Sequence, residues 1–377
     1  MPTALSHDER RDLAGSARAA CDKLLSAERL RAVALETSGR QRGFDAGLWT
    51  ALCSQVGIAA AAMPTSCGGA GYGTPALAVA AHELGRVLAP VPLLSFVLAA
   101  GLLVDAADDG VLTARLPALM DGERTAAVAL VGNGGLWTTS AISFTARRID
   151  GWHVTGSARH VLHGAAADDL VVVAAVDDAP ALFLLDTGAA GVTAETETTL
   201  DGTRPMATII LDDAAAIRLE PDEPFGKVLD RNVNRVLTIL VAEQVGTLER
   251  IVEITTDYAR TRQQFGRPIG SFQAIKHRCA DMLLSLEWAR SAAQAALEAT
   301  DDDGAESSWR ASMAKAVCSE ALRDAAHANI QIHGGIGFTW EDSAHLYLKR
   351  ARTDEVLFGT PGAHWDRLTE LSGLLAV

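Results

Sequence analysis

Long apolar runs are missing from this sequence. No stretch free of Gly, Pro and charged residues reaches the roughly 20 residues that a membrane-spanning helix needs. The first residues, MPTALSHDERRDLAG, are polar and lack the apolar segment of an export signal. Both absences argue against insertion into a membrane or export, so we expect a soluble, cytoplasmic protein with no membrane partner.

Positive charge is also scarce. The 377 residues include 33 Lys and Arg against 47 Asp and Glu, which gives a net charge of −14. A nucleic-acid-binding surface needs a basic footprint that displaces counterions from phosphates. We therefore expect no nucleic acid among the partners of this protein.

Cysteine is sparse, and its spacing matches no metal motif. The five cysteines show no CxxC pair, and the ten histidines form no HExxH pattern. Without an export signal, the expected state of the cysteines is a buried, reduced thiol, and no metal site is predicted. The cysteines are Cys21, Cys53, Cys67, Cys279 and Cys318.

What the sequence does contain divides into three segments that predict three domains. Residues 1–118 are rich in Ala and Leu with helical periodicity, interrupted at Pro90 and Pro92. Residues 119–220 hold short β-rich runs such as DLVVVAAV and ALFLLD, and residues 221–377 return to a helical pattern. The predicted fold class is mostly α with a small central β domain.

Local signals add detail to the second and third segments. Asp150-Gly151 lies between two β-rich runs and predicts a hairpin, because Gly tolerates the positive φ of a tight turn. In the third segment one long helix carries an apolar stripe, and three more helical stretches follow near 272–301, 306–332 and 341–357, enough for a four-helix bundle. The stripe consists of Leu237, Val241, Val245, Leu248 and Val252.

The most informative motif is YARTRQQFGRPIGSFQAIKHRCADM at 258–282. It predicts the end of one long helix, a turn around Phe265, and the start of a second helix. Arg262 falls in the last turn of the first helix and Gln273 in the first turn of the second, where free backbone N–H groups can bind a phosphate. The alternative is an ordinary helix hairpin with solvated arginines.

A second motif, QIHGGIGFTWE, covers residues 331–341. Gly334 and Gly335 would let a phosphate approach the backbone, and a packing-only helix end would not require such a pair, although a Gly-rich helix end is the alternative. A third Gly-rich stretch, GGAGYG at 68–73, follows no predicted strand. It therefore predicts a tight loop between helices and not a dinucleotide cradle.

These motifs, with HELGR at 82–86 and HLYLKRA at 345–351, resemble the acyl-CoA dehydrogenase family over nearly the whole chain. The resemblance is to the diverged bacterial branch that acts in the breakdown of sterols and other specialised acyl-CoA thioesters. It implies an N-terminal helical domain, a β-barrel-like domain and a C-terminal four-helix bundle. It also implies FAD as cofactor, an acyl-CoA substrate and an electron-transfer flavoprotein as acceptor.

The resemblance assigns cofactor roles to six residues. Arg262, Phe265 and Gln273 match positions that contact the adenine-diphosphate part of FAD across a subunit interface. The equivalents of the second group hold the FAD pyrophosphate of the neighbouring subunit, and they are Gln331, Gly334 and Gly335. One chain would thus complete the site of another, as a homo-oligomer or as a heterotetramer with a paralogous subunit.

The catalytic base is where the sequence departs from the family. Removal of the α-proton requires a carboxylate, which in most members precedes a Gly-Thr near the C-terminus, but here Phe358 precedes Gly359-Thr360. The alternative family position, on the helix after the β domain, falls at Val236. In that register Leu237 takes the place where an Arg usually follows, unless Arg235 is that Arg.

The first carboxylate after this position on the helix is Glu243, in VAEQVG, seven residues beyond Val236. That separation is two turns along one face, ~10 Å at ~1.5 Å per residue. Apolar surroundings disfavour the charged form of a carboxyl group and can suit it to proton transfer, so Glu243 is the candidate base. Equally, the carboxylate can simply pair with an Arg or Lys of a neighbouring helix.

Two further departures lie in the β segment. LVGNGGLW at 130–137 replaces the Thr-Glu-Pro-Gly stretch that lines the flavin in the family, and residues 161–164, VLHG, replace Trp-Ile-Thr-Asn. Backbone contacts can survive such replacements. Side-chain contacts to the flavin ring cannot.

Three hypotheses follow. The first is an FAD-dependent acyl-CoA dehydrogenase that oxidises a bulky acyl thioester to its α,β-unsaturated product with Glu243 as base. The second is a non-catalytic subunit that completes the FAD sites of a catalytic paralogue. The third is a flavoenzyme that uses the same fold for another oxidation or a cyclisation.

Overall fold

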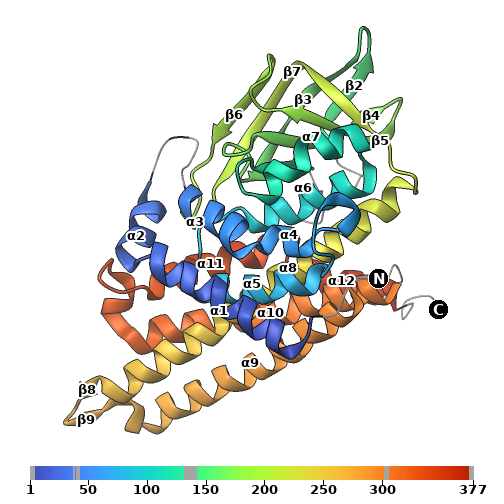
Figure 1. Cartoon of the computed structure of the whole chain (residues 1–377). Helices are drawn as coiled ribbons and strands as arrows, with labels where there is room; N and C mark the ends of the chain where they lie inside the picture. The colour runs from blue at the N-terminus through green and yellow to red at the C-terminus, as the bar shows by residue number, and fades with distance from the viewer. Residues whose placement is uncertain (1–4, 37–38, 40–42, 131–141, 301–304, 373–377) are drawn as a thin grey trace. The chain divides into compact units, whose positions relative to one another are not determined.

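The computed structural model describes the chain except for residues 1–4, 37–38, 40–42, 131–141, 301–304 and 373–377. The chain forms two compact units (Figure 1). The first combines Met1–Leu77 with Pro90–Val236, and the second combines Ala78–Ala89 with Leu237–Val377. Among the described helices, none is both long and apolar enough to cross a membrane.

Four helices of the first unit, α1, α2, α3 and α7, begin with side-chain caps. Ser6 and Glu9 form a capping box at the start of α1, since Ser6 Oγ accepts from the backbone N–H of Glu9 and Glu9 accepts from that of Ser6. Asp108 caps α7 in the same way through the N–H of Val111. The helices are α1 (His7–Leu24), α2 (Ala27–Leu35), α3 (Ala46–Ala51), α4 (Ile58–Ala62), α6 (Leu93–Ala106) and α7 (Asp109–Met120), with short turns at Leu52–Val56 and Thr65–Cys67.

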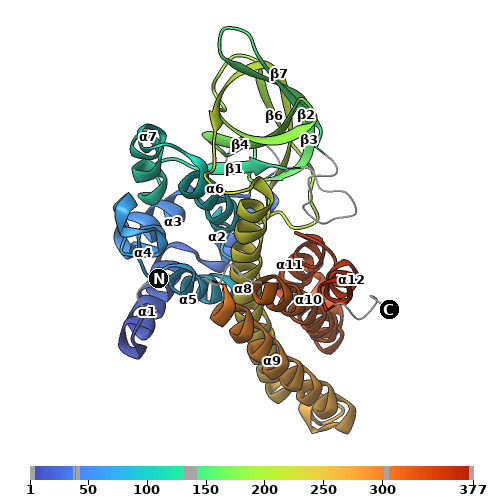
Figure 2. The same ribbon diagram turned by 90° about the vertical axis from the view of Figure 1, so that its right-hand side faces the viewer.

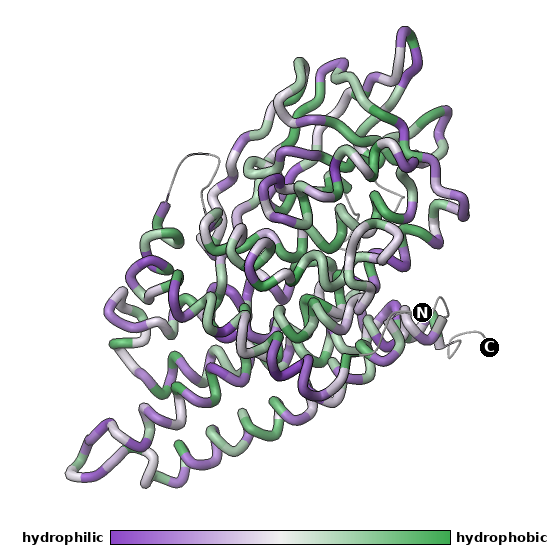
Figure 3. Tube along the Cα trace, viewed as in Figure 1, coloured by the Kyte–Doolittle hydropathy of each residue, from purple (hydrophilic) through white to green (hydrophobic). Residues whose placement is uncertain are grey.

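The β strands of the first unit close into a small barrel, seen end-on in Figure 2. The strand order is β1-β4-β2-β3-β7-β5; β5 also pairs with β4, which closes the ring, and β6 pairs with β7. Hydrophobic and hydrophilic residues are mixed along the strands (Figure 3), and the buried core of the barrel includes Phe144, Leu170 and Phe183. The strands are β1 (Ala126–Ala129), β2 (Phe144–Arg148), β3 (Trp152–Leu162), β4 (Asp169–Val176), β5 (Ala179–Asp186), β6 (Val192–Thr196) and β7 (Met206–Leu219).

The second unit is a bundle of long helices. α5 (Thr74–Arg86) and α8 (Phe225–Thr261) each begin in the first unit and end in the second. A two-stranded hairpin, β8 (Gln263–Gln264) with β9 (Arg267–Pro268), joins α8 to α9. The remaining helices are α9 (Gln273–Ala299), α10 (Ala305–His333), α11 (Ala344–Val356) and α12 (Pro361–Leu371), with a short 3₁₀ segment, η5, at Gly334–Phe338.

Two glycines let α5 and α8 approach backbone to backbone. A Cβ at Gly85 would lie 2.1 Å from the carbonyl oxygen of Glu243, and one at Gly246 would lie 1.9 Å from that of His82. The hydroxyl of Thr247 donates to the carbonyl of Gly85 across the same contact, at 3.0 Å. Any side chain at either glycine would force the two helices apart.

The predicted fold class is confirmed: helices, a small β domain and a helical bundle follow one another along the chain. The hairpin at Asp150-Gly151 connects β2 to β3 as expected. The pattern analysis missed β6 and did not separate α12 from the preceding helices. The boundaries placed after residues 118 and 220 stay predictions.

Candidate functional site

The turn between α8 and α9 presents an aromatic ring to solvent. Phe265 and Gly266 form the tip of the β8–β9 hairpin with φ angles of 54° and 76°, the two consecutive positive values of a type I′ turn. The Phe265 ring is 91% exposed and meets the edge of Phe272 at 6.1 Å. Arg267 lies over the face of Phe272, 4.1 Å from its centre. The ring is thus held where only another molecule can cover it.

Arg262 and Gln273 lie at the two bases of this hairpin. The prediction that Arg262 falls within the last helical turn is slightly wrong, because α8 ends at Thr261. The Arg262 N–H still donates to the carbonyl of Tyr258, at 2.9 Å, and its side chain is exposed. Gln273 is the first residue of α9 and is exposed as well. The structure therefore brings the first three predicted cofactor residues together.

The second predicted group surrounds a cavity of about 470 Å³ at the end of α10. Gly334 has a φ of +65°, and no atom lies within 4 Å of where a Cβ would stand at Gly334 or Gly335. The backbone there is open to a ligand. The cavity is lined by His327, Ile330, Gln331, Gly334, Gly335, Phe338 and Leu348.

The six predicted cofactor residues form two groups, one at the hairpin and one at the α10 terminus. α8 and α10 touch where the ring of Tyr258, one turn before Arg262, stacks on His333, which lies between Gln331 and Gly334. The two ring centres are 4.1 Å apart. Among the described residues, no hydrogen bond or ion pair joins the two groups directly. The sequence analysis assigned no role to His327 or Phe338, which also line the cavity. Phe338 lies within the second motif, and His327 lies four residues before Gln331 on one helix face.

Phe358, at the position where the resemblance predicts the catalytic base, is buried, with 4% of its surface exposed and a φ of 58°. Side chains from α10 and α12 hold the surrounding backbone. Lys315 Nζ donates to the carbonyls of Glu355 and Gly359 at 3.2 and 3.0 Å, and His364 Nε2 is 3.0 Å from the carbonyl oxygen of Phe358. The loop is therefore fixed around an apolar side chain.

Burial lowers the pKa of both Lys315 and His364, the two side chains that contact this backbone. Desolvation lowers the pKa of Lys315 to about 8, against the opposing attraction of Asp354. Desolvation, together with the nearby charge of Lys315, lowers the pKa of His364 to about 4. His364 is accordingly neutral near pH 7.

The candidate base, Glu243, makes a buried ion pair. Its Oε1 accepts from Arg350 of α11 at 2.6 Å, and Glu243 is only 3% exposed while Arg350 is fully buried. A second guanidinium N–H of Arg350 reaches the carbonyl of Leu88 at 3.5 Å. The geometry matches the pairing alternative, and the role of Glu243 as a base stays a prediction.

The residues at and beside the alternative family position also lie in fixed surroundings. Val236 and Leu237 are both fully buried. Arg235 reaches Asp105 of α6, with 3.3 Å between Nη1 and Oδ2, in the first unit. Arg231 and Asn232 bond to the same carboxylate.

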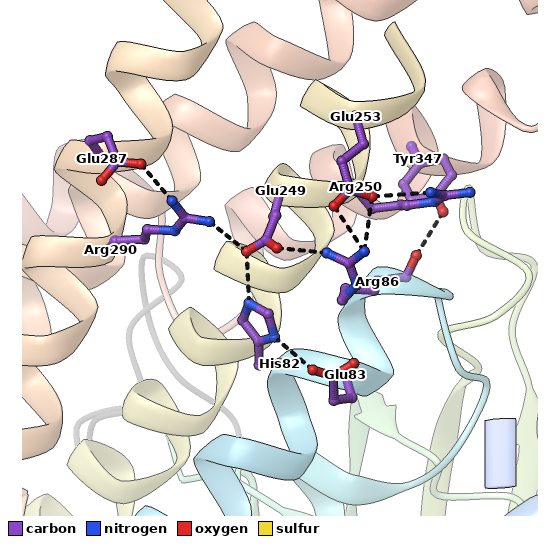
Figure 4. Close-up of polar contacts among 9 residues, drawn as sticks. All are labelled: His82, Glu83, Arg86, Glu249, Arg250, Glu253, Glu287, Arg290 and Tyr347. Carbon is purple, nitrogen blue, oxygen red and sulfur yellow. Dashed lines mark hydrogen bonds and ion pairs between the residues drawn. The ribbon is translucent and has the colours of Figure 1, made fainter. Parts of the chain in front are cut away.

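The HELGR motif anchors a charged network between α5, α8 and α9 (Figure 4). Glu249 accepts from Arg86 at 2.8 Å and from Arg290 at 2.7 Å, and its Oε2 is 3.2 Å from His82 Nε2. Arg86 also donates to both carboxylate oxygens of Glu253 at 2.9 Å.

The network shifts the titration of its members. The hydrogen bond to His82, with help from Arg290 and against the effect of burial, lowers the pKa of Glu249 to about 2. Burial opposes the charging of His82, but hydrogen bonds to Glu249 and Glu83 outweigh it and raise the pKa of His82 above its ordinary value. His82 and Arg86 of the motif therefore connect α5 to α8 through charged hydrogen bonds with Glu249.

Two regions predicted to differ from the family lie in the β domain. Val161, Leu162 and His163 are buried, and His163 Nδ1 is 3.1 Å from the Ser95 hydroxyl. Of the stretch at 130–137, all but Leu130 lies outside the described residues.

The cysteines only partly follow the expectation. All five are free; three are buried, but Cys67 and Cys279 are half-buried, which corrects the expectation that every thiol is buried. In the part of the chain that the structure describes, no three His, Cys, Asp or Glu side chains gather as metal ligands would.

Comparisons with known proteins match both ends of the chain to one family. The family model described as "Acyl-CoA dehydrogenase, N-terminal domain" matches residues 7–123, and the one described as "Acyl-CoA dehydrogenase, C-terminal domain" matches residues 231–371. The chain is 34% identical to the acyl-CoA dehydrogenase IpdE2 of Mycolicibacterium smegmatis over 361 residues, which covers 96% of this chain and 98% of that one.

Two solved structures of similar sequence share the fold. One is a Tcur3481-Tcur3483 steroid ACAD variant, with a TM-score of 0.86 and 32% identity over 98% of this chain and 99% of that one. The other is the ChsE4-ChsE5 complex from Mycobacterium tuberculosis, with a TM-score of 0.86 and 29% identity over 99% of each chain.

Proposed function

Because the chain belongs to the acyl-CoA dehydrogenase family, whose members are FAD-dependent oxidoreductases acting on CH–CH bonds of acyl-CoA thioesters, we propose that it is one subunit of a heteromeric member. In this proposal the chain contributes FAD contacts, and a paralogous subunit contributes the catalytic base. A cytoplasmic location and an electron-transfer flavoprotein as acceptor are parts of the same proposal.

The observation that carries the proposal is Phe358. Dehydrogenation requires a group that takes the α-proton of the thioester, and a phenyl ring has no atom that can do so. The alternative family position, Val236, is a buried aliphatic residue. Neither position of this chain offers a carboxylate, which favours a partner that supplies one.

The residues of both cofactor groups fit a phosphate-bearing aromatic ligand. Arg262 offers a charged donor, Phe265 offers an uncovered ring, and the paired glycines at the end of α10 offer backbone that a phosphate can approach. When bound, FAD supplies the acceptor for the hydride that leaves the β-carbon. The chain's own contribution is to hold and orient the adenine-diphosphate end.

The names of two solved relatives support a paired assembly. The first describes a complex of ChsE4 with ChsE5, and the second joins two names, Tcur3481 and Tcur3483. The second name also includes the word steroid, which favours a bulky, ring-containing acyl thioester as the substrate of the proposed assembly. In the proposed assembly, that substrate would bind next to the catalytic base that the partner subunit supplies.

A self-sufficient dehydrogenase with Glu243 as base is the second candidate, and it is favoured by one observation. Glu243 is the first carboxylate after the family position on α8, two turns further along the helix. Its 2.6 Å contact with Arg350 counts against it, since that pair would have to open before the carboxylate could meet a substrate.

The test is the visible absorption spectrum of the chain purified alone and after co-expression with each paralogue encoded beside it, followed by anaerobic addition of acyl-CoA thioesters. We expect a colourless protein alone and a yellow complex that one thioester bleaches. The matched control is Phe358→Leu, which should leave the bleaching of the complex intact because residue 358 has no chemical role.

The opposite result would be a yellow homo-oligomer of this chain alone that a thioester bleaches. Loss of that bleaching in Glu243→Gln, with flavin still bound, would establish the self-sufficient enzyme and reject the proposed partner subunit.

A further inference from the structure

The imidazole ring of His82 lies between two carboxylates (Figure 4). Its Nε2 is 3.2 Å from Oε2 of Glu249 on α8, and its Nδ1 is 3.5 Å from Oε1 of Glu83 on α5. A neutral imidazole has one N–H and one lone pair, so one of the two carboxylates would face a lone pair. Only the doubly protonated ring presents an N–H to both. The geometry therefore favours the charged form of His82.

The charges around His82 balance when its ring is protonated. Glu83 and Glu249 face the ring, and the carboxylate of Glu249 also binds Arg86 of α5 and Arg290 of α9. The cluster holds four carboxylates and three arginines, with His82 as the fourth cation: Glu83, Glu249, Glu253 and Glu287 with Arg86, Arg250 and Arg290. Glu83 is only 6% exposed, so losing the positive charge beside it leaves a poorly solvated carboxylate with less compensation.

One oxygen of Glu249 is shared between two helices. Oε2 contacts His82 of α5 and accepts from Nη2 of Arg290 on α9 at 2.7 Å, whereas Oε1 accepts from Arg86 at 2.8 Å. When His82 loses one proton, the other should stay on Nδ1, because Glu83 is more buried than Glu249 and Glu249 keeps two arginines. Nε2 then turns a lone pair toward Oε2, and that contact becomes repulsive. Arg290 keeps its charge and its bond to the same oxygen.

We propose that His82 is a proton-dependent link between α5 and α8. The charged ring bridges Glu83 and Glu249 and holds the end of α5 against α8, and the neutral ring leaves Oε2 of Glu249 to Arg290 of α9 alone. Arg86 still binds Glu249 and Glu253, so α5 loosens without detaching. This inference goes beyond the proposed function and does not depend on it.

The direction of the pH effect follows from the surroundings of the ring. Burial opposes the charging of His82, but hydrogen bonds to Glu249 and Glu83 outweigh it and raise its pKa above the ordinary value of 6.5. A group whose pKa is raised by folding stabilises the fold below its ordinary pKa, and this contribution is lost as the pH rises through the folded value. The link should therefore open on the alkaline side of 6.5.

The protonation state is measured in the wild-type chain by NMR with ¹⁵N-labelled histidine, which distinguishes a protonated ring nitrogen from one with a lone pair. The His82 signals are those that disappear in His82→Gln. At about pH 6 both ring nitrogens of His82 should carry a proton, and at about pH 9 only Nδ1 should. A lone pair on either nitrogen at the lower pH, or a proton that stays on Nε2 at the higher pH, would overturn the proposal.

The loosening of α5 is measured by hydrogen exchange of the full wild-type chain over the same pH range, followed by mass spectrometry. Each rate is divided by that of the same peptide when unstructured, which removes the intrinsic effect of pH on exchange. Peptides from the end of α5 should lose protection by about tenfold, the effect of losing one charge-assisted hydrogen bond. Peptides around Arg290 in α9 should keep theirs.

Substitution adds an independent comparison. His82→Gln is neutral at every pH, so α5 should show the low protection of the alkaline wild type throughout. The matched control is His7→Gln, at an exposed histidine of α1, which should behave as the wild type does. Equal loss of protection in α5 and α9 of the wild type, or an unchanged pH dependence in His82→Gln, would show that His82 does not link the two helices in this way.

Discussion

At the residue scale, the carboxylate of Glu243 and the guanidinium of Arg350, which are far apart in sequence, form an ion pair inside the bundle. Glu243 and Arg350 are 107 positions apart and 2.6 Å apart in space. Removing one partner of a buried pair leaves the other charge without compensation, which usually costs more than the pair itself contributes. The pair thus explains why a charged residue can lie in the apolar centre of α8.

This pair leads to a prediction that separates structure from catalysis. Glu243→Gln should lower the free energy of unfolding by about 3–5 kcal/mol, because Arg350 stays buried without its anion. Flavin acquisition with a partner should persist at low temperature. Urea denaturation of the single variant is compared with that of Glu243→Leu combined with Arg350→Met, which removes both charges and should recover most of the loss.

An unchanged urea midpoint together with lost turnover would contradict this interpretation. That combination would identify Glu243 as the base.

The sequence could predict the departure at Phe358 but not the pair at Glu243. Phe358 is adjacent to a Gly-Thr that marks the position, so a local pattern is sufficient. The choice between a base and an ion-pair partner for Glu243 depends on which residue of α11 faces α8. No periodicity within α8 contains that information.

At the scale of elements, the crossing of α5 and α8 depends on two residues that have no side chain. At Gly246 a Cβ would meet the carbonyl of His82 at 1.9 Å, which is closer than any relaxed contact. Gly226, near the start of the same helix, has no atom within 4 Å of its Cβ position. An added side chain should therefore disturb the structure at Gly246 but not at Gly226.

Gly246→Ala should destabilise the protein by about 1–3 kcal/mol or more, since the new methyl group must push backbone and not a flexible side chain. Gly226→Ala should be neutral or should stabilise by up to about 1 kcal/mol through helix propensity. Thermal unfolding of both variants beside the wild type measures the difference. Equal midpoints for the two variants would show that α5 does not approach α8 as described.

The charged network of Figure 4 gives the protein a pH dependence. The pKa of Glu249 is about 2 in the folded chain, below its ordinary value of 4.5. A carboxyl group whose pKa is lowered by folding stabilises the fold above its ordinary pKa, and that contribution disappears as the pH falls through the folded value. Stability should therefore fall between about pH 4.5 and about pH 2.

Glu249→Gln should be less stable than the wild type at neutral pH and should lose less stability across that acidic window. Urea midpoints measured along the window test this, with the exposed Glu28→Gln of α2 as a control. Parallel curves for Glu249→Gln and wild type would contradict the assignment. The raised pKa of His82 has the opposite sign, so its contribution is present below its ordinary pKa and is lost as the pH rises through the folded one.

The sequence predicts which kinds of helix and strand segments are present better than it predicts how many there are. The hairpin between α8 and α9 follows from the Phe-Gly and Arg-Pro pairs at its turn. The strand β6, VTAET, was missed because it is short, polar and mostly exposed, so it lacks an apolar alternation. α11 ends at Val356, where Leu357 turns to an extended conformation and Phe358 has a positive φ, and sequence periodicity cannot detect that.

At the scale of the whole molecule, α9 carries apolar side chains that the described part of the chain leaves half exposed or more. Leu283 and Leu284 are each 50% exposed and Trp288 is 63% exposed. Clustered apolar exposure of this kind is typical of a surface that contacts another protein. It agrees with an assembly in which flavin sites are shared.

Trp288→Glu should weaken that assembly without unfolding the chain. Light scattering after size-exclusion chromatography should show a smaller species, and the circular dichroism spectrum should match that of the wild type. Leu200→Glu, at a residue that is 60% exposed in the first unit, is the control and should leave the mass unchanged. An unchanged mass for Trp288→Glu would remove α9 from the contact surface.

The family resemblance was predictable from a few motifs, and the matches over residues 7–123 and 231–371 confirm it. The cavity was not predictable, because its walls join α10 and η5 to Leu348 of α11. A site of this kind depends on the packing of helices. The motifs identify only the residues on its rim.

The burial of Lys315 makes this residue a chemical reporter of unfolding. Its ammonium group donates to Ser319, to Glu355 and to Gly359, and it is fully buried. An amine-acetylating reagent can therefore reach Lys315 only in molecules whose bundle has opened. An acetylated side chain has a single N–H and cannot supply three bonds, so each labelled molecule is prevented from refolding to the same structure. The rate of acetylation at this lysine would measure how often the bundle opens.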